Sequence, residues 1–379
     1  SMRYLLPLYL VFTLFAAWGL IHLATWARQT WPKATHGWQR ALLALCRAAP
    51  WGVLIGTLVW AAAFMQIYVR PFTRVEASRW MFENIPTAVT VRTQEGLQIQ
   101  VPVQPNAILY QEGRPLQLPF TMDVAGTVNT LTLNKVQLSD PQRDVRLEVT
   151  LATDPDFLAV HTQQEVTLEA DGSSPAKLTV ALPPLQLQAG ARAYVRLRLT
   201  GGAPITLGTS VLGNEHWDDA MPVRIDGKDP FYDWYKGLSS SSDSTMQLYN
   251  NDDAAKWELL HTWLEEVDYI VLSSNRLYGS IARLPQRYPL TVAYYQALFD
   301  GSLGFEPVAE FVSFPALGAC QFEDQEAPFG VPAARYTTAR SCSIPYPVAE
   351  EAFSVYDHPR VLIFAKTDSH ADDIIKIVR

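Results

Sequence analysis

The stretch "LQAGARAYVRLRLTGG", residues 187–202, decides how the middle of this chain folds. Val195, Leu197 and Leu199 alternate there with polar residues, which is the period-two pattern of a strand with one buried face. Ala-Gly precedes the alternating run and Gly-Gly follows it, and both dipeptides are turn signals. The stretch is therefore predicted to be one strand of an antiparallel sheet.

The same alternation recurs upstream of that strand. The apolar positions run from Leu97 to Val103, from Val145 to Leu151 and from Leu178 to Leu182, and glycine-containing turns separate the runs. Many short strands with regular turns are typical of an antiparallel β-sandwich, which we predict for residues 88–203. The segment resembles jelly-roll sandwiches of the carbohydrate-binding kind, so it is either a structural insert or a weakly sugar-binding one.

Two long uncharged segments occur at the start of the chain. Residues 4–27 contain 24 residues without a charge, and residues 48–69 contain 22 more. A bilayer core of about 30 Å needs roughly 20 apolar helical residues, so both segments can span it. The chain is 48% hydrophobic and only 18% charged, which agrees with membrane helices. Its net charge is −8 and no basic stripe is present, which argues against a nucleic-acid partner.

The cations near these segments predict their orientation. Arg28, Lys33, Arg40 and Arg47 fall between the two segments, without an acidic neighbour. The positive-inside rule places this connection in the cytoplasm. We therefore expect an integral protein of the cell membrane, with everything after residue 69 on the extracytoplasmic face of the lipid bilayer.

Helical periodicity surrounds the predicted sandwich on both sides. Residues 70–86 read as a helix that Pro86 stops, and Trp257 to Val267 as another that begins at an Asn/Asp cluster. A further helix is expected from Pro289 to Gly301. Short apolar strands alternate with these helices, and "ITLGTSVLGNEHWDD" is expected to be the strand that naturally follows the first helix.

These patterns predict a membrane-anchored multidomain protein. Residues 1–69 would form a two-helix transmembrane hairpin, and residues 70–87 with 204–379 a small extracytoplasmic α/β domain. The antiparallel β-sandwich of residues 88–203 would be an insert in that α/β domain.

The order of several strings carries a resemblance to a known family. These strings are "TRVEASRWMFENIP" (73–86), "NEHWDDAMPV" (214–223), "DYIVLSSNRLYGSIARLPQRYP" (268–289) and "AEEAFSVYDHPRVLIFAK" (349–366). In this order they resemble the C-terminal portion of the YYY-type polytopic membrane proteins, which look like GT-C glycosyltransferases. Trp217 and Asp218 also match part of the WWDYG motif of oligosaccharyltransferases, whereas His216, Asp219 and Ala220 depart from it.

The resemblance implies that the chain is the C-terminal anchor and accessory part of a larger polytopic protein. GT-C enzymes use lipid-linked sugars, so the implied ligand is a glycan or a polyprenyl-phosphate sugar. Their acidic catalytic motif lies in an early external loop, which has no counterpart here, so this chain is expected to be non-catalytic by itself. The alternative is a stand-alone, membrane-tethered carbohydrate-binding or structural surface module.

One cluster of polar residues stands out as a candidate ligand site. It comprises Glu215, His216, Trp217, Asp218 and Asp219, directly after a predicted strand. Carboxylates accept hydrogen bonds from sugar hydroxyls, and an indole covers an apolar sugar face. We also expect contributions from the end of a second strand, where the polar residues are Asn275, Arg276 and Tyr278.

Two readings of this cluster and of the cysteines remain open. In the alternative to a ligand site, Arg276 or Arg224 simply neutralises Asp218 or Asp219 while Trp217 packs inside, and the cluster is structural. No cofactor is evident from the sequence, and a divalent cation on the carboxylates is an alternative without a recognisable calcium-loop motif. Cys320 and Cys342 form either a disulfide, as an extracytoplasmic domain allows, or two free thiols.

Overall fold

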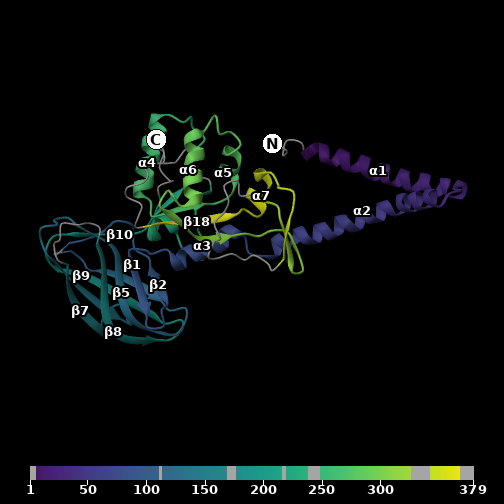
Figure 1. The fold of residues 1–379 in the computed structure, drawn as a ribbon. Helices are drawn as coiled ribbons and strands as arrows, with labels where there is room; N and C mark the ends of the chain where they lie inside the picture. Colours follow the sequence, from purple (N-terminus) through teal and green to yellow (C-terminus); the bar gives the residue numbers. More distant parts are fainter. Residues whose placement is uncertain are drawn as a thin grey trace.

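The computed structural model describes residues 6–110, 113–168, 176–215, 219–237, 248–325 and 342–367. Figure 1 shows a pair of long helices that extends away from a β-sandwich and from a third part in which helices cover a sheet. The boundaries at residues 69, 87 and 203 that the sequence suggests for independent domains stay a prediction. The buried cores described below nevertheless separate residues 88–207 from the residues that surround them in sequence.

The two long helices are α1 (Leu6–Thr30) and α2 (Gly37–Val69), joined by the short 3-10 helix η2 (Trp31–Lys33). Both are long and apolar enough to cross a membrane by length and composition. They contact each other near their connection, where Ala27 and Leu43 are buried. Most of their other large apolar side chains face outward, which suits a lipid environment and would be unfavourable in water.

The β-sandwich consists of two antiparallel sheets. The first has the order β2-β1-β5-β10-β3, with β8 also paired to β5, and the second has the order β4-β9-β6-β7. Strands of the first sheet are β1 (Val89–Thr93), β2 (Gln98–Val101), β3 (Ala107–Leu109), β5 (Gly126–Leu138), β8 (Ala176–Leu187) and β10 (Ile205–Gly208). Strands of the second sheet are β4 (Leu116–Thr121), β6 (Val145–Ala152), β7 (Val160–Leu168) and β9 (Arg192–Gly201).

The period-two pattern in the sequence explains this packing. Val195 and Leu197 of β9 are fully buried between the sheets, whereas Arg198 on the same strand points outward. The antiparallel strands and the sandwich are thus confirmed. Glu148 of β6 departs from the pattern because it is buried on the outer face, where Arg198 and Gln163 donate hydrogen bonds to it.

The third part is built on a mixed five-stranded sheet of order β12-β11-β13-β18-β14. Its strands are β11 (Val211–Asn214), β12 (Lys236–Gly237), β13 (Tyr269–Leu272), β14 (Phe305–Phe311) and β18 (Val361–Lys366). β11 runs parallel to β12 and β13, whereas β18 is antiparallel to β13 and β14.

Helices cover both faces of this sheet. They are α3 (Thr73–Asn84), the π-helical turn η4 (Pro230–Trp234), α4 (Ala254–Glu266), α5 (Arg276–Ile281) and α6 (Pro289–Asp300). Ile270 and Leu272 pack toward α4 and α6, while Val271 between them packs toward α3. Burial on both faces explains why β13 reads as a continuous apolar run.

The helix signals in the sequence correspond to α3, α4 and α6. Asp253 caps α4 by accepting a hydrogen bond from the Lys256 backbone N–H, and Gly301 ends α6 in the left-handed conformation with φ 83°. The strand expected from "ITLGTSVLGNEHWDD" is wrong as a single element. Its first part is β10 in the sandwich, and its second part is β11 in the mixed sheet.

The break falls at Thr209 and Ser210, whose hydroxyls donate to the backbone oxygens of Trp234 and Pro86. These contacts turn the chain from one sheet into the other. Alternation alone carries no information about which sheet a strand joins, so the sequence could not place this break.

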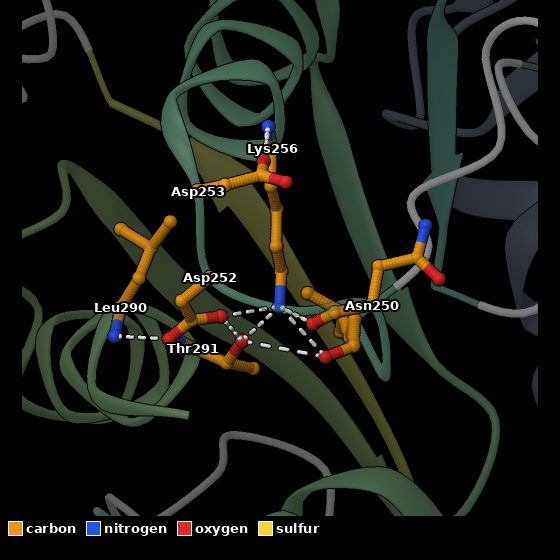
Figure 2. A network of polar contacts seen from close by, with 7 residues as sticks. Asn250, Asp252, Asp253, Lys256, Leu290 and Thr291 are labelled. Carbon is orange, nitrogen blue, oxygen red and sulfur yellow. Dashed lines mark hydrogen bonds and ion pairs between the residues drawn. The ribbon is translucent and has the colours of Figure 1, made fainter. Parts of the chain in front are cut away.

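A buried lysine joins the starts of two helices, as Figure 2 shows. The Lys256 ammonium donates to the backbone oxygens of Leu248 and Asn250, at 2.8 and 3.0 Å, and to Asp252 and Thr291, both at 2.6 Å. Asp252 also accepts from the backbone of Leu290 at the start of α6. Four partners offset the cost of burying the charge, so the network fixes α4 against α6.

A fourth, small sheet lies next to the end of α2. It contains β15 (Ala316–Leu317), β16 (Cys320–Glu323) and β17 (Cys342–Pro345), and the short helix α7 (Glu351–Asp357) follows it. A disulfide joins Cys320 to Cys342, which are register partners in the parallel pair β16–β17. Of the two alternatives for this cysteine pair, the structure contains the bonded one.

Candidate functional site

Glu215 lies immediately after β11, and its carboxylate is enclosed by two tyrosines of α6. The Tyr294 hydroxyl donates to Oε1 at 3.0 Å and the Tyr295 hydroxyl to Oε2 at 2.8 Å. Only 6% of the residue is exposed. Burial raises the pKa of Glu215 to about 8, against the opposing effect of the two hydrogen bonds. The group therefore holds its proton at neutral pH.

Asp219 faces Arg74, which comes from the first turn of α3. The Arg74 Nη1 atom lies 3.1 Å from Asp219 Oδ1, and its Nε donates to the Ser273 backbone oxygen at 3.1 Å. Burial lowers the pKa of the Arg74 guanidinium, and the charge of Asp219 counteracts that shift. The neutralising arginine is thus neither Arg276 nor Arg224, the two that the sequence suggested. Arg224 instead lies 3.8 Å from Asp229.

The three candidates after β13 have different surroundings. Asn275 is buried and accepts a hydrogen bond from Ser354 of α7 at 3.2 Å. Tyr278 is fully buried against the rings of Tyr295 and Phe299, and burial raises the pKa of its hydroxyl above the usual range. Only Arg276 is partly exposed and borders the same hollow as Glu215 and Asp219.

We call Glu215, Asp219, Arg74 and Arg276 the edge cluster. It lies where the parallel strands β11 and β13 end, the position at which α/β sheets bind ligands. The hollow that Glu215, Asp219 and Arg276 border has a volume of about 10 Å³, close to the minimum for one water molecule. His216, Trp217 and Asp218 lie outside the described residues. Among the described residues on either side of them, the side-chain amide of Asn214 pairs with the backbone of Met221.

Within the edge cluster, Arg74 and Asp219 pair with each other, and Glu215 is bound by the two tyrosines of α6. In the described ranges, no three His, Cys, Asp or Glu side chains gather in a way that could hold a metal ion. The chemistry available at this edge is the protonation of Glu215 and the binding of a water-sized polar group.

A much larger cleft lies between α3 and the β-sandwich. Its volume is about 810 Å³, and we call it the α3–sandwich cleft. Its walls come from the end of α3, from β2 and β4, and from the segment that leads into η4. The polar residues that line it include Glu83, Asn84, Gln98, Asp123, Arg192 and Lys228.

Aromatic rings and a buried amide complete this cleft. The Lys228 ammonium lies 5.1 Å from the ring centroid of Phe82 and 4.9 Å from that of Trp234. The Gln100 side-chain oxygen accepts hydrogen bonds from Thr87 and Thr90. Its buried amide nitrogen has no hydrogen-bond partner within the described part of the chain, so the wall holds a spare donor.

Sequence reasoning missed this cleft entirely. Its walls come from residues 82–84, 96–100, 102, 119–121, 123, 192, 228 and 234, which carry no shared motif. Lys228 and Phe82, whose ring it contacts, are more than a hundred residues apart in the sequence. Nothing in the local sequence pattern predicts that contact. The one available signal for the cleft was the group of exposed polar residues on β2 and β4.

Comparisons with known proteins leave the family open. No protein-family model matches this sequence, and no curated protein matches it. Among solved structures, a Podospora anserina GH26-CBM35 β-(1,4)-mannanase is 18% identical with a TM-score of 0.18, over 48% of this chain and 33% of that one.

Two further structures are similar at the same low level. CBM32 of AlyQ in complex with 4,5-unsaturated mannuronic acid is 9% identical with a TM-score of 0.14, over 28% of this chain and 95% of that one. A family two carbohydrate esterase from Cellvibrio japonicus is 14% identical with a TM-score of 0.16, over 37% and 44%. Similarity at these TM-scores carries no argument about function, which must rest on the molecule itself.

Proposed function

We propose that this chain is a membrane-anchored glycan-binding module whose ligand site is the α3–sandwich cleft. The observation that carries the proposal is the volume of the cleft, about 810 Å³, within the range of roughly 300–1,000 Å³ typical of small-molecule sites. The hollow at the edge cluster is far too small for a sugar ring. The cleft also lies between two separately packed cores, where ligand sites are frequent.

The chemistry of the walls favours a neutral polyhydroxylated ligand. Two carboxylates, Glu83 and Asp123, face the cleft together with the two cations Arg192 and Lys228. The charges balance, so a strongly charged polymer gains little, whereas sugar hydroxyls can both donate to carboxylates and accept from cations and amides. Asn84 and Gln98 add groups that can do both.

Membrane attachment follows in this proposal from the two apolar helices. α2 ends at Val69 and α3 begins at Thr73, so only a few residues separate the second helix from the cleft-bearing part. The cationic connection between the helices favours a cytoplasmic turn, and the disulfide favours an oxidising compartment for the remainder. Both support an extracytoplasmic module.

A binding experiment on the full chain in lipid nanodiscs tests this function. A panel of neutral gluco-, galacto- and manno-oligosaccharides is screened, and the best ligand is titrated by calorimetry. Arg192→Ala should weaken binding on the order of tenfold to a hundredfold, because a hydrogen bond to a charged group contributes about 1.5–3 kcal/mol.

The matched control is Arg143→Ala, which removes an exposed arginine outside the cleft. It should leave the affinity unchanged. Equal binding by wild type and Arg192→Ala would remove the cleft as the site. Absence of binding by every oligosaccharide would refute the glycan-binding function.

A second proposal concerns a larger parent protein. The resemblance of four strings to the YYY-type proteins is the ground for proposing a C-terminal position in a GT-C-like membrane glycosyltransferase, with this chain non-catalytic by itself. The observation that favours it is the short connection between α2 and α3, which keeps the α3–sandwich cleft close to the proposed membrane anchor. The module would then hold an acceptor or a lipid-linked sugar near the membrane. Absence of transfer from polyprenyl-phosphate sugars by a purified longer protein would reject it.

A further inference from the structure

We propose that the uncharged run of residues 343–348, "SIPYPV", lies in the outer interface of the bilayer beside α2. The inference rests on the proposed membrane anchoring and adds a second contact between the protein and the lipid. It therefore assigns a membrane-binding surface to the disulfide-linked sheet, in addition to the two helices.

The first observation is the exposure of the run. Ile344, Tyr346 and Val348 are 40%, 39% and 49% exposed, and the six residues contain no charge. Every residue from 343 to 348 is exposed. Consecutive exposed apolar residues are unfavourable in water, so such a run normally marks a contact surface.

The second observation is the position of the run along α2. The Tyr346 ring stacks on Trp60, with 4.2 Å between centroids and 16° between planes. Phe322 of β16 meets the same indole edge-on at 5.5 Å. Trp60 lies nine residues, about 13 Å of helix, before the end of the uncharged stretch 48–69. A segment that stacks on Trp60 is therefore level with the apolar layer or with its border.

The third observation places that border near Trp60. The 33 residues of α2 extend over about 50 Å, whereas the hydrocarbon layer is about 30 Å thick. Counted from the connection, Leu6 is 24 residues from Thr30, and Ala61 is likewise 24 residues from Gly37. Within the described residues, the last two turns of α2 thus have no counterpart in α1.

Protein contacts cover one face of those last turns of α2, while Met65 and Val69 stay exposed on the other. Ala63 and Ile67 are 1% and 4% exposed, whereas residues 51–59 are all exposed. The Tyr68 hydroxyl donates to Asp357 at 2.8 Å. Next to Phe64 lies the buried pair of His358 and Asp324, a polar group that hydrocarbon would disfavour.

The residue types at this level fit an interface between lipid and water. Tryptophan and tyrosine are enriched there because each ring has an apolar body and one polar group. The disulfide at Cys342 fixes the start of the run against β16. The bilayer border is therefore expected at Trp60 and Tyr346, with Ile344 and Val348 among the lipid headgroups and upper acyl chains.

Spin-label accessibility on the full chain in phosphatidylcholine nanodiscs tests this inference. In a Cys46→Ser background, single labels are placed through Ile344→Cys and Val348→Cys. Leu54→Cys on α2 serves as the lipid reference, and Leu158→Cys, 88% exposed on the sandwich, as the water reference. One label per chain, measured by mass, shows that the native disulfide is kept.

Collisions with oxygen, which partitions into lipid, are compared with those of a water-soluble nickel chelate. We expect oxygen to dominate at Leu54→Cys, Ile344→Cys and Val348→Cys, and the chelate at Leu158→Cys. If the labels at 344 and 348 behave like Leu158→Cys while Leu54→Cys is in lipid, the inference is wrong and the anchoring stands. If Leu54→Cys is also in water, the anchoring itself fails and the inference with it.

Discussion

The edge cluster and the α3–sandwich cleft are both polar, but the polar groups of the edge cluster are mostly bound to other protein groups, whereas those of the cleft mostly face open space. In the edge cluster, Glu215 is bound by two tyrosines and Asp219 by Arg74, and the remaining space is water-sized. In the cleft, most polar side chains line open space. Removing one residue should therefore affect stability at the edge cluster and affinity at the cleft.

The largest expected effect concerns the buried carboxyl of Glu215. Its folded-state pKa of about 8 exceeds the usual value of 4.5. Between pH 4.5 and pH 8, the folded protein therefore retains a proton that the unfolded chain has released. Stability from this group is complete below about pH 4.5, falls as the pH rises toward 8, and is constant above it. The full loss is on the order of several kcal/mol, at 1.36 kcal/mol per pKa unit.

Glu215→Gln should remove this pH dependence, because the amide resembles the protonated acid and does not ionise. Thermal unfolding of the full chain in detergent between pH 5 and 8 measures it. The matched control is Glu258→Gln on the exposed face of α4, which should retain the wild-type slope. A variant whose melting temperature declines with pH as steeply as the wild type would contradict the buried-acid interpretation.

The second effect concerns the buried ion pair of the same cluster. Arg74→Ala leaves Asp219 with its charge in a site where each side chain is less than 15% exposed. Losing one partner of a buried pair typically costs about 3 kcal/mol or more. We expect a clear drop in the melting temperature of the full chain.

Arg79→Ala is the control for that substitution. Arg79 lies on the same helix as Arg74 and pairs with Asp226, but both side chains are about half exposed, 49% and 51%. Water screens such a pair, so the melting temperature should hardly change. Similar drops for both variants would mean that the edge cluster is no more buried than the surface.

Elements with local signals were predictable from the sequence, and contacts between distant segments were not. The alternation around Val195 and Leu197 gives a strand because the period is local, and Pro289 and Gly301 bracket α6 for the same reason. Helix 70–86 likewise corresponds to α3. Each of these signals lies within about a dozen residues.

The candidate site was predictable only in part. The ends of β11 and β13 were identified, and the structure brings Glu215, Asp219 and Arg276 to one hollow. Arg74 was missed as the partner of Asp219 because 145 residues separate them and no pattern links them. Folding decides such pairings through packing of the whole sheet, so the distinction between a satisfied cluster and an open cleft required the structure.

The smallest expected effect tests the cleft with a neutral residue. Gln98 on β2 is exposed in the cleft wall and can donate and accept hydrogen bonds. Gln98→Ala should weaken oligosaccharide binding about two- to tenfold, since one uncharged hydrogen bond contributes roughly 0.5–1.5 kcal/mol. Gln164→Ala, an equally exposed glutamine on β7 outside the cleft, should leave the affinity unchanged.

Neither glutamine variant should change the melting temperature, because neither side chain is buried. Titration calorimetry and thermal unfolding on the same samples separate the two effects. If Gln98→Ala lowers the melting temperature but leaves the affinity unchanged, Gln98 has a structural role, like the residues of the edge cluster, and does not bind the ligand. A loss of affinity at unchanged stability is the result expected of an open site. The Gln98 side chain lines the cleft and is exposed rather than packed in a core, so its removal should affect only the ligand.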